Sequence, residues 1–129
     1  MAMRVMLVDD NENDLLYTRI VLERCGLAVE VQAFEFARQA LQSLADGSAG
    51  GVDIILLDIN MPGMDGFEFL DAYQALTDAR RARAAVVMLT SSSHGADRER
   101  AMAYACVKGY VVKPIDVETA CALVRHVER

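Results

Sequence analysis

The chain has 129 residues, of which 53% are hydrophobic and 25% charged, a composition typical of one globular domain and not of a disordered segment. Its net charge of −6 argues against nucleic acid as a partner, because nucleic-acid binding favours a basic surface. The chain has no signal-peptide pattern and no apolar run near the roughly 18 residues of a membrane span, which predicts a cytoplasmic protein without membrane contact.

The first strand and helix are predicted from the start of the chain. Residues 4–8 are mostly apolar and indicate a short strand. Glu12 and Asp14 suit the positive end of a following helix, and Gly26 is a natural residue to end it. Two residues could cap this helix by accepting hydrogen bonds from its first N–H groups: Asn11 or Asn13.

The next segments lead to the centre of the predicted sheet. Residues 28–34 alternate between apolar and polar side chains, as expected of an edge strand with one wetter face. Apolar residues then recur with a helical period between residues 37 and 44. Residues 52–57 are the central strand, because the run from Ile54 to Leu57 is apolar on both faces.

A third helix and a fourth strand follow. The loop at residues 62–66 contains proline and glycine, and the inner face of the helix after it carries Phe69, Tyr73 and Leu76. Residues 84–89 form another unbroken apolar run. We interpret this run as a strand that is buried like the central one.

The last elements complete a regular alternation. Residues 96–105 indicate an alanine-rich helix, residues 107–112 a fifth strand, and Asp116 can cap a final helix. Five strand–helix repeats are therefore joined by short connections without a linker. This order predicts one α/β domain over residues 1–129, with a doubly wound parallel sheet, right-handed crossovers and helices on both faces.

Two isolated features are interpreted as structural. The chain has three widely spaced cysteines that match no metal-ligand pattern: Cys25, Cys106 and Cys121. We interpret them as small buried apolar residues in a reducing compartment. A basic cluster is interpreted as a solvated turn between a helix and a strand: Arg80, Arg81 and Arg83.

Polar side chains follow four of the five predicted strands: Asp9 and Asp10, Asp58, Thr90, and Lys113. Because the carboxyl ends of parallel strands lie at one edge of the sheet, these side chains can converge there. Three carboxylates would repel each other unless a cation joins them, and Mg²⁺ suits such oxygen ligands. Lys113 and Thr90 could then bind an anion attached to Asp58, such as a phosphoryl group.

The same segments resemble those of response-regulator receiver domains. The resemblance lies in Asp9-Asp10, in residues 58–66 (DINMPGMDG), in Leu89-Thr90-Ser91 and in residues 109–114 (GYVVKP). It covers nearly the whole chain and implies a flavodoxin-like fold with the strand order 2-1-3-4-5. Because no DNA-binding or catalytic output domain accompanies it, we expect a stand-alone receiver. Some receivers with similar segments serve phytochrome-type kinases.

The resemblance implies a chemical role for the acidic residues. Asp58 would accept a phosphoryl group from a phosphohistidine of a sensor histidine kinase or of a histidine phosphotransfer domain. Mg²⁺ would be held by Asp10, Asp58 and the main-chain carbonyl of Asn60, with Asp9 helping through water. The protein would act only on itself, by this phosphotransfer and by autodephosphorylation.

The resemblance also implies a switch. Thr90 and Lys113 would bind phosphoryl oxygens, and the Lys113–Pro114 peptide bond would be cis. Tyr110 would turn inward when Thr90 is drawn to the phosphoryl group. The surface of the last two helices and the last strand would then change for a protein partner or a phosphorelay. Both a monomer and a phosphorylation-dependent homodimer are compatible with this.

Other classes of protein share parts of the pattern. A small Mg²⁺-dependent phosphohydrolase with an aspartyl-phosphate intermediate is the main alternative, but such enzymes usually carry an acid where this chain has Asn60. A calcium loop at Asp58 is disfavoured by Pro62 at a ligand position. A flavin-binding domain would need a phosphate-cradling loop where the chain has Asp9-Asp10. A receiver that is never phosphorylated is disfavoured by the complete set of acidic, threonine and lysine side chains.

Overall fold

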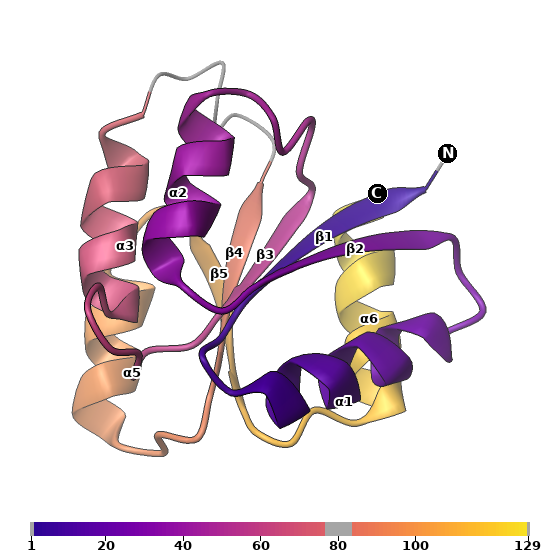
Figure 1. Ribbon diagram of the computed structural model, residues 1–129. Coiled ribbons are helices and arrows are strands. Elements are labelled where there is room, and N and C mark those ends of the chain that lie inside the picture. The colour runs from indigo at the N-terminus through magenta and orange to yellow at the C-terminus, as the bar shows by residue number, and fades with distance from the viewer. Residues whose placement is uncertain (1, 77–83, 129) are drawn as a thin grey trace.

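A five-stranded parallel sheet forms the centre of the computed structural model, which describes residues 2–76 and 84–128 (Figure 1). The strands are β1 (Met3–Val8), β2 (Val29–Phe34), β3 (Ile54–Leu57), β4 (Ala85–Thr90) and β5 (Val107–Val112). The helices are α1 (Glu12–Glu23), α2 (Ala37–Ala45), α3 (Gly66–Gln74), α5 (Gly95–Met102) and α6 (Val117–Glu128). The predicted basic cluster at residues 80–83 lies outside the described residues.

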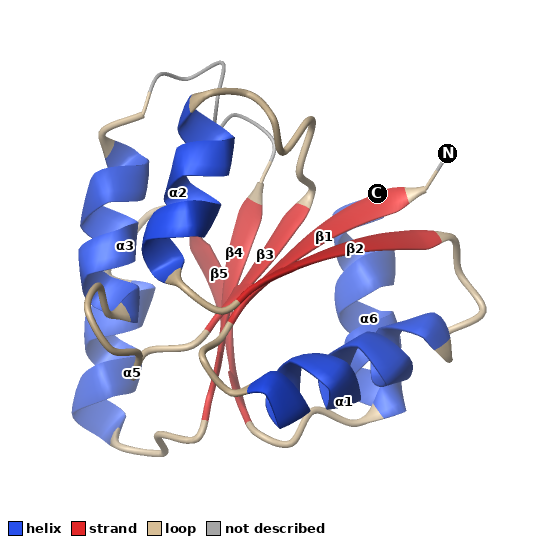
Figure 2. Cartoon of the chain, viewed as in Figure 1, coloured by secondary structure: helices blue, strands red, loops and turns tan. Residues whose placement is uncertain are grey.

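The strand order is β2-β1-β3-β4-β5, and all four neighbouring pairs are parallel. Helices α1 and α6 cover one face of the sheet, while α2, α3 and α5 cover the other (Figure 2). The predicted fold class and strand order are therefore confirmed. None of the helices in the part of the chain that the structure describes has both the length and the apolar character of a membrane span.

The central strand β3 explains why the carboxyl edge of the sheet can hold polar groups. All four of its residues are buried, with Ile55 and Leu57 in the core under α2, α3 and α5, and Ile54 and Leu56 in the core under α1 and α6. Apolar side chains on both faces fix this strand in the middle of the sheet. The residue that follows it, Asp58, is therefore held at the edge of a rigid scaffold.

Helix caps set the direction in which the chain leaves this edge. The Asn11 side chain accepts hydrogen bonds from Asn13 N and Asp14 N, at 2.9 and 3.1 Å, and so caps α1. Asp65 and Glu68 form a reciprocal capping box at the start of α3. Of the two caps that the sequence left open for α1, Asn11 is the one observed.

The cysteine prediction is wrong in two respects: two of the cysteines are paired, and none of the three is fully buried. Cys25 and Cys121 form a disulfide with a Cα–Cα distance of 5.3 Å, and both are partly buried, as is Cys106. The disulfide connects the chain just after α1 to α6, two helices that pack on the same face of the sheet (Figure 1). The partners are 96 residues apart, so their spacing could not reveal the pair. Such a disulfide is uncommon in a reducing compartment, and the cytoplasmic location stays a prediction.

Replacing Cys121 with serine is expected to destabilise the oxidised protein by about 3 kcal/mol, because the disulfide closes a long loop in the unfolded chain. Urea unfolding with and without dithiothreitol measures this difference. Cys106→Ser is the matched control, because Cys106 lies outside the disulfide. A Cys121→Ser variant as stable as the wild type under oxidising conditions would contradict the stabilising role of this bond.

Candidate functional site

Two buried carboxylates extend the sheet beyond its strands. Asp9 N donates to Phe34 O at 3.1 Å and Asp58 N donates to Val8 O at 3.0 Å, so both residues continue the backbone pairing of β1 and β3. Each residue is only 6% exposed. Their side chains therefore lie at the carboxyl edge of the sheet in positions that the backbone fixes.

A third carboxylate joins this pair. One oxygen each from Asp9, Asp10 and Asp58 lies within 4.8 Å of the other two. A cluster made only of carboxylate oxygens suits a hard divalent cation, which would also offset their repulsion. The cluster could therefore hold a metal ion, as the sequence predicted. Asn60 lies two residues beyond Asp58 and is exposed, and the role of its carbonyl as a ligand stays a prediction.

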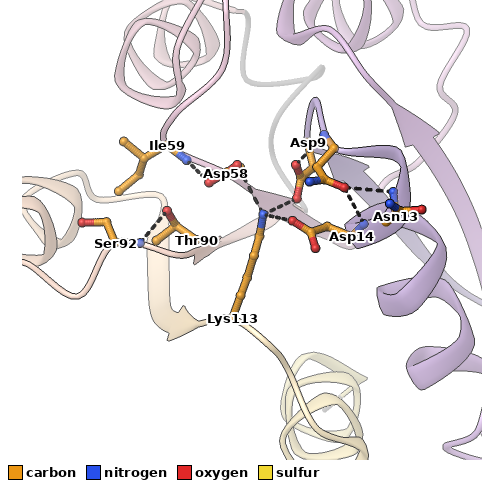
Figure 3. A network of polar contacts seen from close by, with 9 residues as sticks. Asp9, Asn13, Asp14, Asp58, Ile59, Thr90, Ser92 and Lys113 are labelled. Atoms are coloured by element: carbon orange, nitrogen blue, oxygen red, sulfur yellow. Dashed lines mark hydrogen bonds and ion pairs between the residues drawn. The ribbon is translucent and has the colours of Figure 1, made fainter.

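Lys113 supplies the positive charge of the site (Figure 3). Its Nζ lies 2.5 Å from Asp9 Oδ2, 2.9 Å from Asp14 Oδ2 and 3.3 Å from Asp58 Oδ2. The backbone N–H of Lys113 donates to Thr90 O at 2.8 Å, which fixes the residue beside β4. The Lys113–Pro114 peptide bond is cis, as the family resemblance implied.

The charges of the site depend on each other. Burial disfavours the ammonium of Lys113, but hydrogen bonds to Asp9 and Asp14 and the charge of Asp58 outweigh it and raise the lysine pKa. Burial raises the pKa of Asp9, and its hydrogen bond to Lys113 opposes that change. Lys113 therefore stays charged at neutral pH and offsets part of the negative charge of the cluster.

Backbone N–H groups orient the carboxylates. Asp58 Oδ1 accepts a hydrogen bond from Ile59 N at 2.8 Å, while Oδ2 faces Lys113. Asp9 Oδ1 accepts from Asn11 N at 2.9 Å. Asp58 thus has one oxygen held by the backbone and the other beside an ammonium group, in a site that could also hold a cation. An anion attached to Asp58 would therefore lie close to the Lys113 ammonium group and to any cation held by the acidic cluster.

Thr90 and Tyr110 are connected through one loop residue. Thr90 is fully buried at the end of β4, and its Oγ1 accepts a hydrogen bond from Ser92 N at 3.3 Å. The Tyr110 hydroxyl donates to Ser92 O at 2.8 Å. The Ser92 hydroxyl in turn donates to Asp97 Oδ2 in α5 at 2.6 Å. The loop after β4 therefore connects Thr90 with both β5 and α5.

Two contacts of the site were missed in the sequence. Asp14 was interpreted only as an acid that suits the start of α1, but its carboxylate pairs with Lys113. Ser92 was not predicted to join Thr90 to Tyr110. Asp14 lies in the first turn of α1, close in sequence to the end of β1, and this position is a signal that could have placed it near the strand ends.

The fold and the site define an α/β domain with a buried aspartate that belongs to an acidic cluster and faces a lysine. The chain belongs to the response regulator receiver domain family, whose sequence model matches residues 5–125. Members of this family are phosphorylation-dependent switches in two-component signalling, and this chain is one of them. The family favours the switch over the phosphohydrolase alternative.

Individual relatives agree with this assignment. A receiver protein from Dyadobacter fermentans DSM 18053 is 32% identical with a TM-score of 0.86, and the match covers 98% of each chain. The bacteriophytochrome response regulator AtBRR is 34% identical with a TM-score of 0.79, over 99% of this chain and 94% of the other. The sensor protein GacS of Pseudomonas syringae pv. syringae is 32% identical over 115 residues, which are 88% of this chain and 12% of that protein. The chain spans from 12% to 50% of the length of such curated relatives.

Proposed function

We propose that Asp58 is the phosphoacceptor of this receiver domain, which residues 1–129 form as one unit. The donor is a phosphohistidine of a sensor histidine kinase or of a histidine phosphotransfer domain. The observation that carries this proposal is the buried Asp58 carboxylate, which faces Lys113 at 3.3 Å and belongs to the three-acid cluster. The likeness to a bacteriophytochrome response regulator supports a phytochrome-type kinase as the partner.

The chemistry requires mainly positioning and charge stabilisation. An Asp58 oxygen attacks phosphorus, the P–N bond of phosphohistidine breaks, and its electron pair stays on the imidazole. Lys113 and the Thr90 hydroxyl stabilise the phosphoryl oxygens. Mg²⁺, when bound by Asp9, Asp10, Asp58 and the Asn60 carbonyl, would offset the negative charge that gathers in the site. Loss of the group by autodephosphorylation resets the switch.

The signal passes from the phosphoryl group to a surface made of α5, β5 and α6. Phosphorylation adds nearly two negative charges at Asp58. Movement of Thr90 toward them would pull on the Ser92 backbone, to which Tyr110 is bonded. Met102 of α5 and Val112 of β5 are each 43% exposed, so a protein partner on this surface would cover apolar side chains there. This partner is a second copy of the chain or a downstream protein.

Phosphorylation at Asp58 is tested by the intact mass of the protein after incubation with acetyl phosphate and Mg²⁺. We expect one added phosphoryl group on the wild type and none on Asp58→Asn, because the amide is a poor nucleophile. Metal removal with EDTA is expected to abolish the adduct. If the wild type gains no mass and also fails to bind beryllofluoride, Asp58 is not a phosphoacceptor.

A further inference from the structure

The carboxylate of Asp14 differs from the other acids around Lys113. It comes from the first turn of α1, whereas Asp9 and Asp58 follow strands (Figure 3). Its side chain is 41% exposed, against 9% for Asp9 and 7% for Asp58. It is also not one of the three acids that could share a metal ion. Asp14 is therefore the partner of Lys113 that has direct access to water.

The number of hydrogens on Lys113 limits its partners. An ammonium group has three N–H donors, and Lys113 Nζ lies within 3.3 Å of three carboxylates. A phosphoryl group on Asp58 replaces the Asp58 carboxylate as an acceptor and draws the ammonium group toward its own oxygens, so Asp9 and Asp14 then compete with it for Lys113. Asp9 is enclosed at the sheet edge and is held by Asn11 N. Asp14 can turn toward solvent, where water stabilises its charge, whereas Asp9 would stay buried without its ammonium partner.

We propose that Asp14 is a positioning residue that competes with the phosphoryl group for Lys113. This inference rests on the proposed function of Asp58. In the resting protein, Asp14 holds Lys113 beside Asp9, and the negative charge of Asp14 offsets part of the positive charge of the lysine. In the phosphorylated protein, Asp14 is the carboxylate that yields, and its remaining charge repels the phosphoryl oxygens. Asp14 thereby weakens the hold of the site on the bound group.

The test uses beryllofluoride as the phosphoryl probe, titrated by calorimetry at saturating Mg²⁺. Asp14→Asn keeps the size of the side chain and removes its charge. We expect this variant to bind beryllofluoride about two- to fivefold more tightly, because Lys113 no longer has to leave Asp14 to bind the probe. The factor is small because the Lys113–Asp14 ion pair is partly exposed. Its affinity for Mg²⁺ alone should not rise, because Asp14 is outside the acid cluster and its loss leaves Lys113 free to pair with Asp9 and Asp58. Asp14→Glu, which keeps the charge, should stay near the wild type.

Glu12→Gln is the matched control, because Glu12 lies in the same helical turn, is exposed, and is not among the three acids paired with Lys113. Unchanged or weaker beryllofluoride binding in Asp14→Asn would overturn the competition. An equal gain in Glu12→Gln would overturn it as well, since the effect would then be one of overall charge. Failure of the wild type to bind beryllofluoride would overturn the role of Asp58 itself, and Asp14 with it. If the wild type binds beryllofluoride and Asp14→Asn binds it equally well, only the role of Asp14 is overturned, and the proposed role of Asp58 stands.

Discussion

Alanine at position 66 is expected to destabilise the domain by about 3 kcal/mol, because a Cβ there has no room. It would lie 2.5 Å from Asp58 O and 2.8 Å from Ile59 Cα, and both are backbone atoms. Gly66 N also donates to Ile59 O at 2.8 Å, which holds the start of α3 against the chain that follows β3. Relieving the clash requires a backbone shift at residues 58–59 or at the start of α3, and either shift disturbs the chain that positions Asp58.

Gly95→Ala is the matched control for this substitution. Gly66 begins α3 and Gly95 begins α5, but a Cβ on Gly95 meets nothing within 4 Å. We expect Gly95→Ala to stay within about 1 kcal/mol of the wild type. Urea unfolding gives both values, and the rate of acetyl phosphate labelling of Gly66→Ala should fall roughly tenfold because Asp58 is displaced. A Gly66→Ala variant with normal stability and labelling would show that this close packing does not position Asp58.

The sheet could be predicted because each strand pattern reflects one physical condition. β3 is apolar at every position because both of its faces are covered. β2 alternates because it lies at the edge of the sheet, where its residues remain partly or fully exposed. The strand order could not be predicted in this way, since no local pattern determines which strands are neighbours. It came from the family resemblance, and the structure confirms it.

The site could be predicted only for residues that end strands. The direction of parallel strands alone brings Asp9, Asp58 and Lys113 to one edge. Asp14 comes from α1 instead, and its contact with Lys113 depends on how that helix packs on the sheet. The Cys25–Cys121 disulfide depends on the packing of α1 against α6 in the same way. Such relations between distant elements leave no periodic pattern in the sequence.

Removal of the lysine charge by Lys113→Met is expected to lower the free energy of unfolding by about 3 kcal/mol in the absence of divalent ions. Methionine has a similar size, so the main change is electrostatic. Asp9 and Asp58 would remain buried without their shared positive partner, and a buried ion that loses its partner is strongly destabilising. Phosphorylation should also be lost, because Lys113 no longer stabilises the phosphoryl oxygens. Urea unfolding and intact mass measure the two effects.

Lys108→Met is the control, because Lys108 is an exposed lysine of β5 whose Nζ donates only to Ala105 O among the described contacts. Lys108→Met should lower the free energy of unfolding by less than about 1 kcal/mol. Mg²⁺ should stabilise Lys113→Met more than the wild type, since the ion takes over the role of the lost charge. Adding Asp58→Asn to Lys113→Met should restore part of the stability, because it removes one of the repelling carboxylates. If the second substitution restored nothing, the loss would come from packing, and the electrostatic account of this site would be wrong.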